Sequence, residues 1–205
     1  MIIKKYVTGP IEVNTYFVGD EKNKTGVIID PGGTNGELTS FIQGFGYKVE
    51  YILLTHGHSD HIGGVLQYKE MFDSKVVAYI DEEPMLNSHK LNFSKAVYRT
   101  EIEFDADIYV EDDEELEVGD LKFKFLHTPG HTKGGMSILL DDVVFSGDTL
   151  FCQSIGRTDF PGSSFRQIKE SIHDKLFTLD PNTRVLPGHM GETSIGFEIS
   201  NNPFL

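Results

Sequence analysis

A chain of 205 residues and 23.0 kDa is long enough for one domain with a sizeable hydrophobic core, and we expect a single domain over residues 1–205. With 18 Lys and Arg against 32 Asp and Glu, the formal net charge of -14 disfavours nucleic acid and anionic membranes as partners. The lone Cys152 excludes an internal disulfide, and neither a signal peptide nor a membrane span is evident, so we expect a soluble cytoplasmic protein.

The first half of the chain predicts a β-meander followed by alternating helices and strands. Runs rich in β-branched residues predict strands over residues 2–7, 15–18, 26–29, 49–54 and 76–80. Apolar residues at helical spacing predict helices over 37–45 and 62–72. Residues 81–105 contain Pro84 and show little periodicity, so they predict a short helix and an irregular excursion.

The second half predicts hairpins and one further helix. Residues 111–117 hold six carboxylates and predict a solvated loop before a strand. Alternation and turn residues predict a hairpin arm over 121–126 and a hairpin from 136–140 to 143–145, and an apolar stripe predicts a helix over 165–176 before a strand over 184–186. Two batches of strands, each followed by helices, predict an α+β fold, an αββα sandwich of two mixed β-sheets with helices on the outer faces.

One segment directly after the apolar strand 49–54 concentrates side chains that bind metals. His56, His58, Asp60 and His61 lie within six consecutive positions, and Gly63-Gly64 follows them. Such a set would crowd donors and lone pairs together, an arrangement that is costly when buried unless a metal ion pairs them. The spacing therefore predicts metal ligands.

Three more candidate ligands follow later strands, each in a turn: His131, Asp148 and His189. Taken singly, each is more simply interpreted as an ordinary turn residue. As a set, ligands on loops at one end of a rigid sheet scaffold are what a metal-centred active site requires.

The order His-x-His-x-Asp-His, then His, then Asp, then His resembles the metallo-β-lactamase superfamily over nearly the whole chain. Within it, Gly147-Asp148-Thr149-Leu150-Phe151 and Gly156-Arg157 are similar to hydroxyacylglutathione hydrolases, that is, glyoxalase II and its short relatives. The resemblance implies one metal ion on His56, His58 and His131, a second on Asp60, His61 and His189, and Asp148 bridging the two.

The resemblance also implies the chemistry. Nitrogen and carboxylate ligands suit two divalent ions, with zinc favoured and iron or manganese accepted by the same set. Such a pair lowers the pKa of a shared water, so that a hydroxide bridging the metals attacks the acyl carbon of a small-molecule thioester or ester. Asp60 and Asp148 are the implied catalytic residues, since Asp60 can orient the water and Asp148 bridges the metals.

Other reactions on the same scaffold stay open. A persulfide dioxygenase with a single iron shares a similar Gly-Arg-Thr-Asp-Phe stretch, and a lactone or ester hydrolase is a further alternative. A true β-lactamase is less favoured, because Asp148 occupies a position that those enzymes usually fill differently. Glyoxalase II enzymes carry a C-terminal helical domain with basic residues for glutathione, whereas 16 residues follow His189 here, so glutathione itself is not implied.

The remaining polar candidates have simpler interpretations. Arg157 is the candidate substrate-binding residue, although a role in locking its own loop through a carboxylate is favoured. We expect His127 to support a strand end through a hydrogen bond, and His173 and His89 to lie on the surface. Cys152 has no adjacent histidine to activate it, so we expect a small buried side chain.

Overall fold

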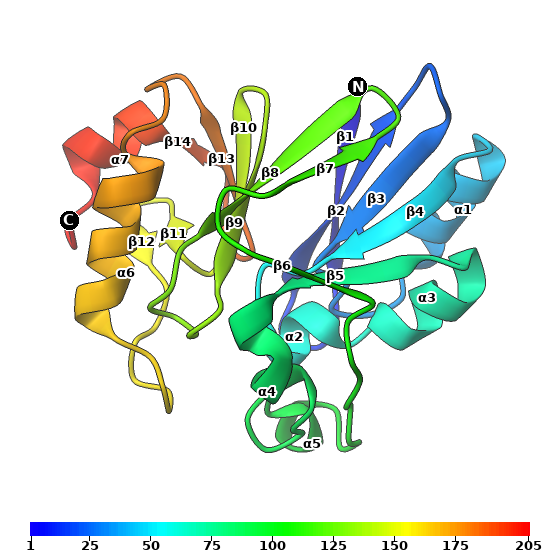
Figure 1. The fold of residues 1–205 in the computed structure, drawn as a ribbon, viewed down its shortest axis with the longest axis horizontal. Coiled ribbons are helices and arrows are strands. Elements are labelled where there is room, and N and C mark those ends of the chain that lie inside the picture. The colour runs from blue at the N-terminus through cyan, green and yellow to red at the C-terminus, as the bar shows by residue number, and fades with distance from the viewer.

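Two six-stranded β-sheets pack face to face in the computed structural model, which describes residues 1–205 (Figure 1). The first sheet has, in order, β1 (Ile2–Thr8), β2 (Val13–Asp20), β3 (Thr25–Ile29), β4 (Lys48–Leu53), β5 (Lys75–Tyr79) and β6 (Ile108–Val110). The second has, in order, β14 (Thr193–Ser194), β13 (Arg184–Pro187), β10 (Val143–Gly147), β9 (Met136–Leu140), β8 (Leu121–His127) and β7 (Glu115–Val118). A separate ribbon pairs β11 (Leu150–Phe151) with β12 (Ser154–Ile155).

Helices lie on the outer faces of both sheets (Figure 1). The first sheet carries α1 (Gly36–Gly44) and α3 (Val65–Phe72), and the second carries α6 (Phe165–Ser171), its π-helical continuation η2 (Ile172–Leu176) and α7 (Ile195–Asn201). Four short helices complete the chain: α2 (Ser59–Ile62), η1 (Ile80–Glu82), α4 (Glu83–Leu86) and α5 (Ser94–Val97). The predicted αββα sandwich is confirmed.

Alternation along the strands divides the core into layers. On β2, Tyr16 and Val18 point into the cluster of 18 buried residues between the sheets, whereas Phe17 belongs to the cluster of 16 under α1 and α3. Successive strand residues point to opposite faces, so a strand that is buried on both sides serves both layers. The predicted meander is confirmed, because β1, β2 and β3 pair antiparallel before β4 and β5 join in parallel.

One predicted helix is interrupted. Apolar spacing predicts a single helix over 62–72, but α2 ends at Ile62 and α3 begins at Val65. A Cβ at Gly63 would collide with the carbonyl oxygen of Gly32, and a Cβ at Gly64 would lie 2.8 Å from the carbonyl carbon of Gly33. The glycine pair therefore lets the chain turn tightly against the loop after β3.

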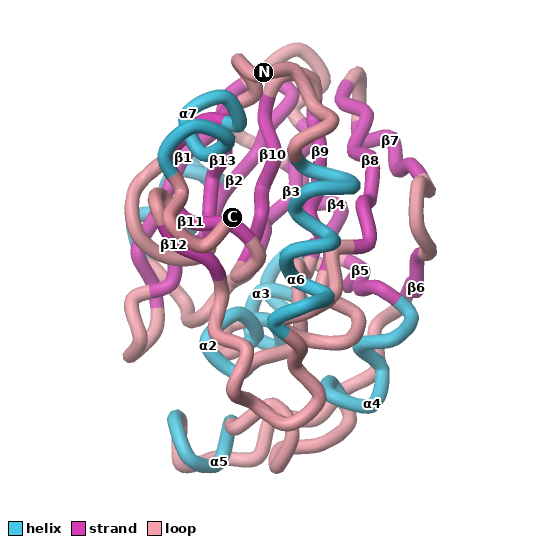
Figure 2. The backbone as a smooth tube through the Cα atoms, turned by 90° about the vertical axis from the view of Figure 1, so that its left-hand side faces the viewer, coloured by secondary structure: helices cyan, strands magenta, loops and turns pink.

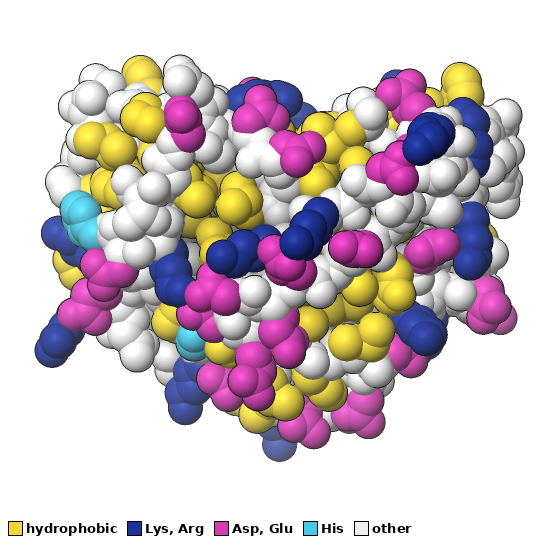
Figure 3. All heavy atoms as spheres, turned by 45° about the horizontal axis from the view of Figure 1, so that its top comes forward, with side chains coloured by type: hydrophobic (Ala, Val, Ile, Leu, Met, Phe, Trp, Pro, Cys, Tyr) yellow, Lys and Arg dark blue, Asp and Glu magenta, His cyan; other side chains and the backbone are white.

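The structure contains elements that the sequence did not predict. Residues 81–105 form three short helices rather than one, and β6, β11, β12, β14 and α7 were not anticipated. The acidic segment 111–117 is largely exposed, as predicted, but only residues 111–114 form the predicted loop, because residues 115–117 already pair with β8 as part of β7. On the face shown in Figure 3, acidic and basic side chains lie next to one another. No helix combines the length and apolar character that crossing a membrane requires.

The fold brings loops of both sheets to one edge of the sandwich. Figure 2 shows loops and the short helices α2, α4 and α5 gathered beyond one end of the strands. The segments that follow β4, β8, β10 and β13 carry all of the candidate ligands, with Asp60 and His61 on α2 and the others on loops. Since β10 and β13 run parallel, the turns after them start side by side at the same edge.

Candidate metal centre

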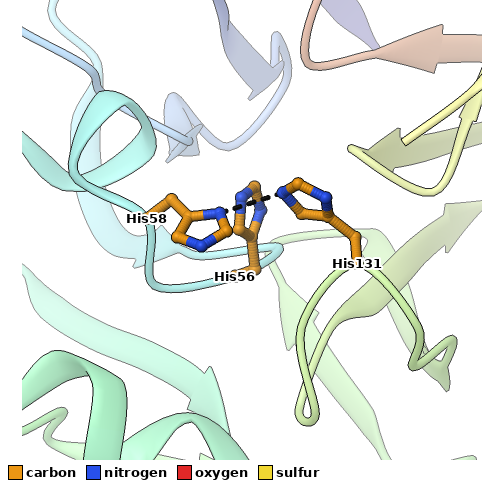
Figure 4. Close-up of side chains that lie close together, drawn as sticks. All are labelled: His56, His58 and His131. Carbon is orange, nitrogen blue, oxygen red and sulfur yellow. Dashed lines mark hydrogen bonds between the residues drawn. The ribbon is translucent and has the colours of Figure 1, made fainter. Parts of the chain in front are cut away.

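Three histidines from two loops form the first cluster of the site. His56 and His58 lie on the loop after β4, and His131 lies on the loop after β8 (Figure 4). Their ligand atoms all lie within 4.8 Å of one another, and His58 Nδ1 is 2.9 Å from His131 Nε2. All three side chains are buried, so they face one another rather than bulk water.

A second cluster lies next to the first. Asp60 and His61 come from α2, and His189 comes from the turn after β13. His189 Nε2 lies 3.1 Å from Asp60 Oδ2, and His61 Nε2 lies 3.8 Å from the same oxygen. Although α2 is only four residues long, it places Asp60 and His61 next to His189, which lies in a turn of the other sheet.

Asp148 lies between the two clusters. Its Oδ1 is 3.3 Å from His61 Nε2, and its Oδ2 is 3.7 Å from His131 Nε2 and 3.8 Å from His189 Nε2. The structure thus brings together all seven side chains that the sequence nominated, with Asp148 in contact with members of both groups.

Several buried polar atoms of these residues have no hydrogen-bond partner. They are His56 Nε2, His61 Nε2 and Asp148 Oδ1. Leaving a buried donor or acceptor unpaired costs about 1–3 kcal/mol. A divalent cation accepts lone pairs from imidazole nitrogen and carboxylate oxygen, so these residues fit a metal ion.

Hydrogen bonds on the far side of two rings set their tautomers. His131 Nδ1 donates to the carbonyl oxygen of Arg157 over 2.8 Å, and His61 Nδ1 lies 2.9 Å from Asp30 Oδ2, which can only accept when ionised. The opposite nitrogen of each ring, Nε2, therefore presents a lone pair to the site. Metal-binding histidines are commonly oriented in this way.

Burial and neighbouring charges shift the protonation of the cluster. Burial lowers the pKa of His56 well below its ordinary value, and burial together with nearby His131 lowers the pKa of His58 to about 3. Burial alone would raise the pKa of Asp148, but His61 outweighs it and holds the pKa below the ordinary range. Burial thus favours neutral imidazoles at His56 and His58. At His61, burial is outweighed by the carboxylates of Asp148, Asp30 and Asp60, which raise its pKa. Neutral imidazole and carboxylate are the forms that bind cations.

A pocket of about 600 Å³ opens onto both clusters. Its floor includes His58, Asp60, His131, Asp148 and His189. Its walls are largely apolar and include Ile11, Phe93, Ala96, Val97, Phe151, Ile155, Phe160 and Met190. A small molecule in this pocket would therefore lie directly against the candidate metal ligands.

Residues 8–189 match the family model described as "Metallo-beta-lactamase superfamily". This chain belongs to the metallo-β-lactamase superfamily. Members of the superfamily are metal-dependent hydrolases, and the two-sheet fold matches that of its solved members. Family membership therefore agrees with the fold, the buried histidines and the unpaired ligand atoms.

Relatives cover nearly the whole chain. The probable metallo-hydrolase YqgX of Bacillus subtilis is 38% identical over 98% of this chain and 96% of that protein. The hydroxyacylglutathione hydrolase GloC of Haemophilus influenzae is 35% identical over 91% of this chain and 89% of its own. Similarity to these superfamily members extends from the first sheet through the second.

Solved structures of superfamily members superpose over the full length. The crystal structure of BLEG-1 B3 metallo-β-lactamase has a TM-score of 0.92 at 37% identity, covering 100% of this chain and 99% of that one. The TM-score is 0.86 at 33% identity for TTHA1623 in a di-iron-bound form, covering 98% and 100%. It is 0.80 at 31% identity for ETHE1 from Myxococcus xanthus, covering 99% and 84%.

Asp30 is a site residue that the sequence analysis missed. It follows β3 and accepts hydrogen bonds from the backbone N–H of Thr55 at 2.8 Å, from Thr55 Oγ1 at 2.6 Å and from His61 Nδ1 at 2.9 Å. An acidic residue at the end of the apolar run Val27–Ile29, before Pro31, was the available signal. Because β3 and β4 are parallel neighbours, this carboxylate reaches the start of the ligand loop.

We expect Asp30→Ala to weaken zinc binding about 10- to 100-fold, as for other residues that orient metal ligands. The change removes the acceptor that fixes the His61 ring and leaves buried donors of Thr55 unpaired. Zinc affinity measured by competition with a chelator checks this. Wild-type affinity in Asp30→Ala would show that His61 is oriented without Asp30.

The other histidines lie outside the two clusters. His127 stacks on Tyr79 with ring centroids 4.1 Å apart, and its Nε2 donates to the carbonyl oxygen of Lys133, which confirms its predicted structural role. His89 Nδ1 lies 2.6 Å from Glu103, and His173 is exposed. The prediction for Cys152 was wrong, because the side chain is partly exposed rather than buried.

Arg157 lines the pocket and also braces its loop. Its guanidinium donates to both carboxylate oxygens of Asp159 over 2.9 and 2.8 Å and lies 4.4 Å above the Phe160 ring. The Arg157–Asp159 ion pair is the contact with a carboxylate through which Arg157 was expected to hold its own loop in place. The backbone carbonyl of Arg157 orients His131, so this loop contributes to the metal centre through its main chain as well.

Proposed function

We propose that this chain is a metal-dependent hydrolase of the glyoxalase II type, which cleaves a small hydroxyacyl thioester. One observation carries the proposal: seven histidine and aspartate side chains cluster together, five of them line a pocket, and three of their buried atoms lack hydrogen-bond partners. The 35% identity to a hydroxyacylglutathione hydrolase supports the thioester class.

The proposed ligand sets follow the two clusters. We assign one divalent cation to His56, His58 and His131, a second to Asp60, His61 and His189, and the bridging role to Asp148. Zinc suits these nitrogen and oxygen donors, and the di-iron-bound neighbour supports iron as the alternative.

Bound divalent ions supply a Lewis acid that lowers the pKa of water toward neutrality and polarises a carbonyl oxygen. Asp60 faces the pocket, and its carboxylate orients the attacking water by accepting a hydrogen bond. Water adds to the acyl carbon, the carbon–sulfur bond breaks, and a carboxylic acid and a thiol leave. Asp148 fixes the separation of the two clusters through its contacts with His61 and His131.

Arg157 is the proposed substrate-binding residue at the pocket wall. Its Nε and Nη2 atoms are used by Asp159, which leaves Nη1 to donate to a substrate oxygen. The stacked Phe160 ring keeps the guanidinium plane in place. A hydroxyl or carbonyl oxygen of the acyl group is a suitable acceptor for the Nη1 N–H donors.

Metal analysis combined with a substrate panel tests the proposed function. We expect two metals per chain and thioester cleavage without oxygen, abolished by a chelator. The panel also includes a lactone, a persulfide with oxygen uptake, and a β-lactam, the last because of the likeness to BLEG-1. One iron per chain with oxygen consumption would contradict the hydrolase and indicate a persulfide dioxygenase. Cleavage of the β-lactam or the lactone alone would contradict the thioester as the substrate class.

A further inference from the structure

The walls of the pocket carry almost no free charge. Of the sixteen lining residues, eight are hydrophobic, and the others are five proposed metal ligands, two serines and Arg157. Arg157 is therefore the only cationic side chain besides the histidines that lines the pocket. Its charge is already matched by the two-point contact with Asp159.

This lining disfavours an anionic substrate group. A carboxylate on the part of the substrate that lies against the apolar side chains, away from the proposed metal ligands, loses hydration without gaining an unpaired cationic side chain, and the whole chain adds a formal charge of -14. An apolar group gains instead, because Phe93 and Phe160 stand together, with ring centroids 5.4 Å apart, beside His58. Aromatic rings of this kind bury apolar ligand surface effectively.

Resting on the thioester hydrolase proposed above, we propose that the site selects thioesters whose thiol half is apolar and uncharged. The thiol half lies against the wall formed by Phe93, Ile155 and Phe160, and the acyl half lies over the histidines. This orientation places the carbon–sulfur bond between the apolar wall and the proposed ligands.

Two lactoyl thioesters with a common acyl group test the selectivity: one of benzyl thiol and one of glutathione, which carries two carboxylates. We expect kcat/KM to be about 10-fold or more higher for the benzyl thioester, a factor typical of one desolvated charge or a few buried methylenes. An equal or higher kcat/KM for the glutathione thioester would overturn the selectivity while leaving the hydrolase intact. Cleavage of neither would overturn the proposed function, and this selectivity with it.

A cation added to the pocket lining tests the role of charge with a single substrate, the glutathione thioester. Ile11 lines the pocket and is 46% exposed, so Ile11→Lys adds a cation with little loss of packing. We expect a lower KM for the glutathione thioester. Met71→Lys is the matched control, since Met71 is also 46% exposed but does not line the pocket. The same fall in KM in both variants would contradict a local effect.

A buried carboxylate outside the ligand set supports a second, independent inference. Glu82 ends η1 and is 1% exposed. Its Oε2 accepts the backbone N–H of Gly57 at 2.8 Å, and its Oε1 accepts that of Gly134 at 2.9 Å. Gly57 lies between His56 and His58, and Gly134 lies three residues after His131. One carboxylate therefore joins the two loops that carry the first cluster.

Both loops approach Glu82 so closely that only glycine fits. A Cβ at Gly57 would lie 2.9 Å from Glu82 Oε2, and a Cβ at Gly134 would lie 2.5 Å from the Glu82 backbone nitrogen. Burial raises the pKa of Glu82, and the two N–H donors oppose that effect. Burying a carboxylate is costly unless it is hydrogen-bonded, so the two N–H bonds from Gly57 and Gly134 stabilise Glu82 in this position.

We infer that Glu82 is a positioning residue that holds His56 and His58 at the correct distance from His131 and so sets the metal affinity of the first cluster. It touches neither the pocket floor nor the proposed ligands' side chains, and it acts through the main chain of Gly57 and Gly134.

Zinc affinity of Glu82→Gln tests this inference. An amide NH2 cannot accept an N–H, so one of the two bonds is lost and two donors face each other. We expect zinc to bind the first site about 10- to 100-fold more weakly, measured by chelator competition. Glu82→Asp keeps a carboxylate but shortens its reach by one methylene, and it should weaken zinc binding in the same direction if Glu82→Gln fails to fold.

Glu198→Gln is the matched control. Glu198 is also fully buried and accepts hydrogen bonds from the Gln153 N–H at 2.9 Å and from Thr193 Oγ1 at 2.5 Å, but it lies on α7 and does not line the pocket. We expect a lower Tm with unchanged zinc affinity in this control. Wild-type zinc affinity in Glu82→Gln, with a fall in Tm like that of Glu198→Gln, would reduce Glu82 to a structural residue.

Discussion

Asp148→Ala is expected to lower kcat of the metal-loaded protein roughly 1000-fold, because it removes the one carboxylate that contacts both clusters. The buried Oδ1 of Asp148 has no hydrogen-bond partner, so its removal costs the fold no hydrogen bond. We therefore expect the fold to persist. The measurement is kcat with the benzyl thioester on protein whose metal content has been determined.

Asp142→Ala provides the control for this experiment. Asp142 is exposed in the turn before β10, at the end of the strand opposite Asp148, and we expect wild-type kcat and metal content from its replacement. Near-wild-type turnover in metal-replete Asp148→Ala would contradict the bridging role. Loss of turnover together with loss of the circular dichroism spectrum would assign Asp148 to the fold instead.

Most of the site could be predicted because its residues mark strand ends. His56, His58, Asp60 and His61 are close together in sequence, so one turn suffices to collect them. Asp148 and His189 lie 41 positions apart but follow strands that are parallel neighbours, and such strands end at the same edge. The residues that directly line the centre were thus accessible from spacing and hydrophobic pattern.

Residues that support the centre through hydrogen bonds could not be predicted in the same way. Glu82 falls in a segment without periodicity, and nothing in the sequence indicates that its side chain is buried between two loops. The apolar pattern continues at helical spacing across Gly63 and Gly64, but the helix is interrupted there. The reason is that this glycine pair packs against Gly32 and Gly33 of another loop. Such features depend on tertiary contacts, which local pattern does not encode.

Removing the metals with a chelator is expected to abolish thioester cleavage and to lower Tm, while the circular dichroism spectrum is retained. Ligand binding to the folded state adds RT ln(1 + [L]/Kd) to stability, about 4.1 kcal/mol at 1,000 times Kd, so loss of the metals removes that contribution. The sheets do not depend on the metals, since the three hydrophobic clusters of 18, 16 and 8 buried residues hold them together.

The order in which activity and stability return on adding zinc then tests the two-cluster arrangement. Two sites that share Asp148 should each add to Tm, and we expect activity to be complete only after the second equivalent, because the proposed water-orienting Asp60 belongs to the second cluster. Isothermal titration with Tm and activity measured at each step provides the readings. Full activity and full Tm at one equivalent would contradict a dinuclear centre, and a Tm that does not respond to zinc would contradict binding at these seven residues.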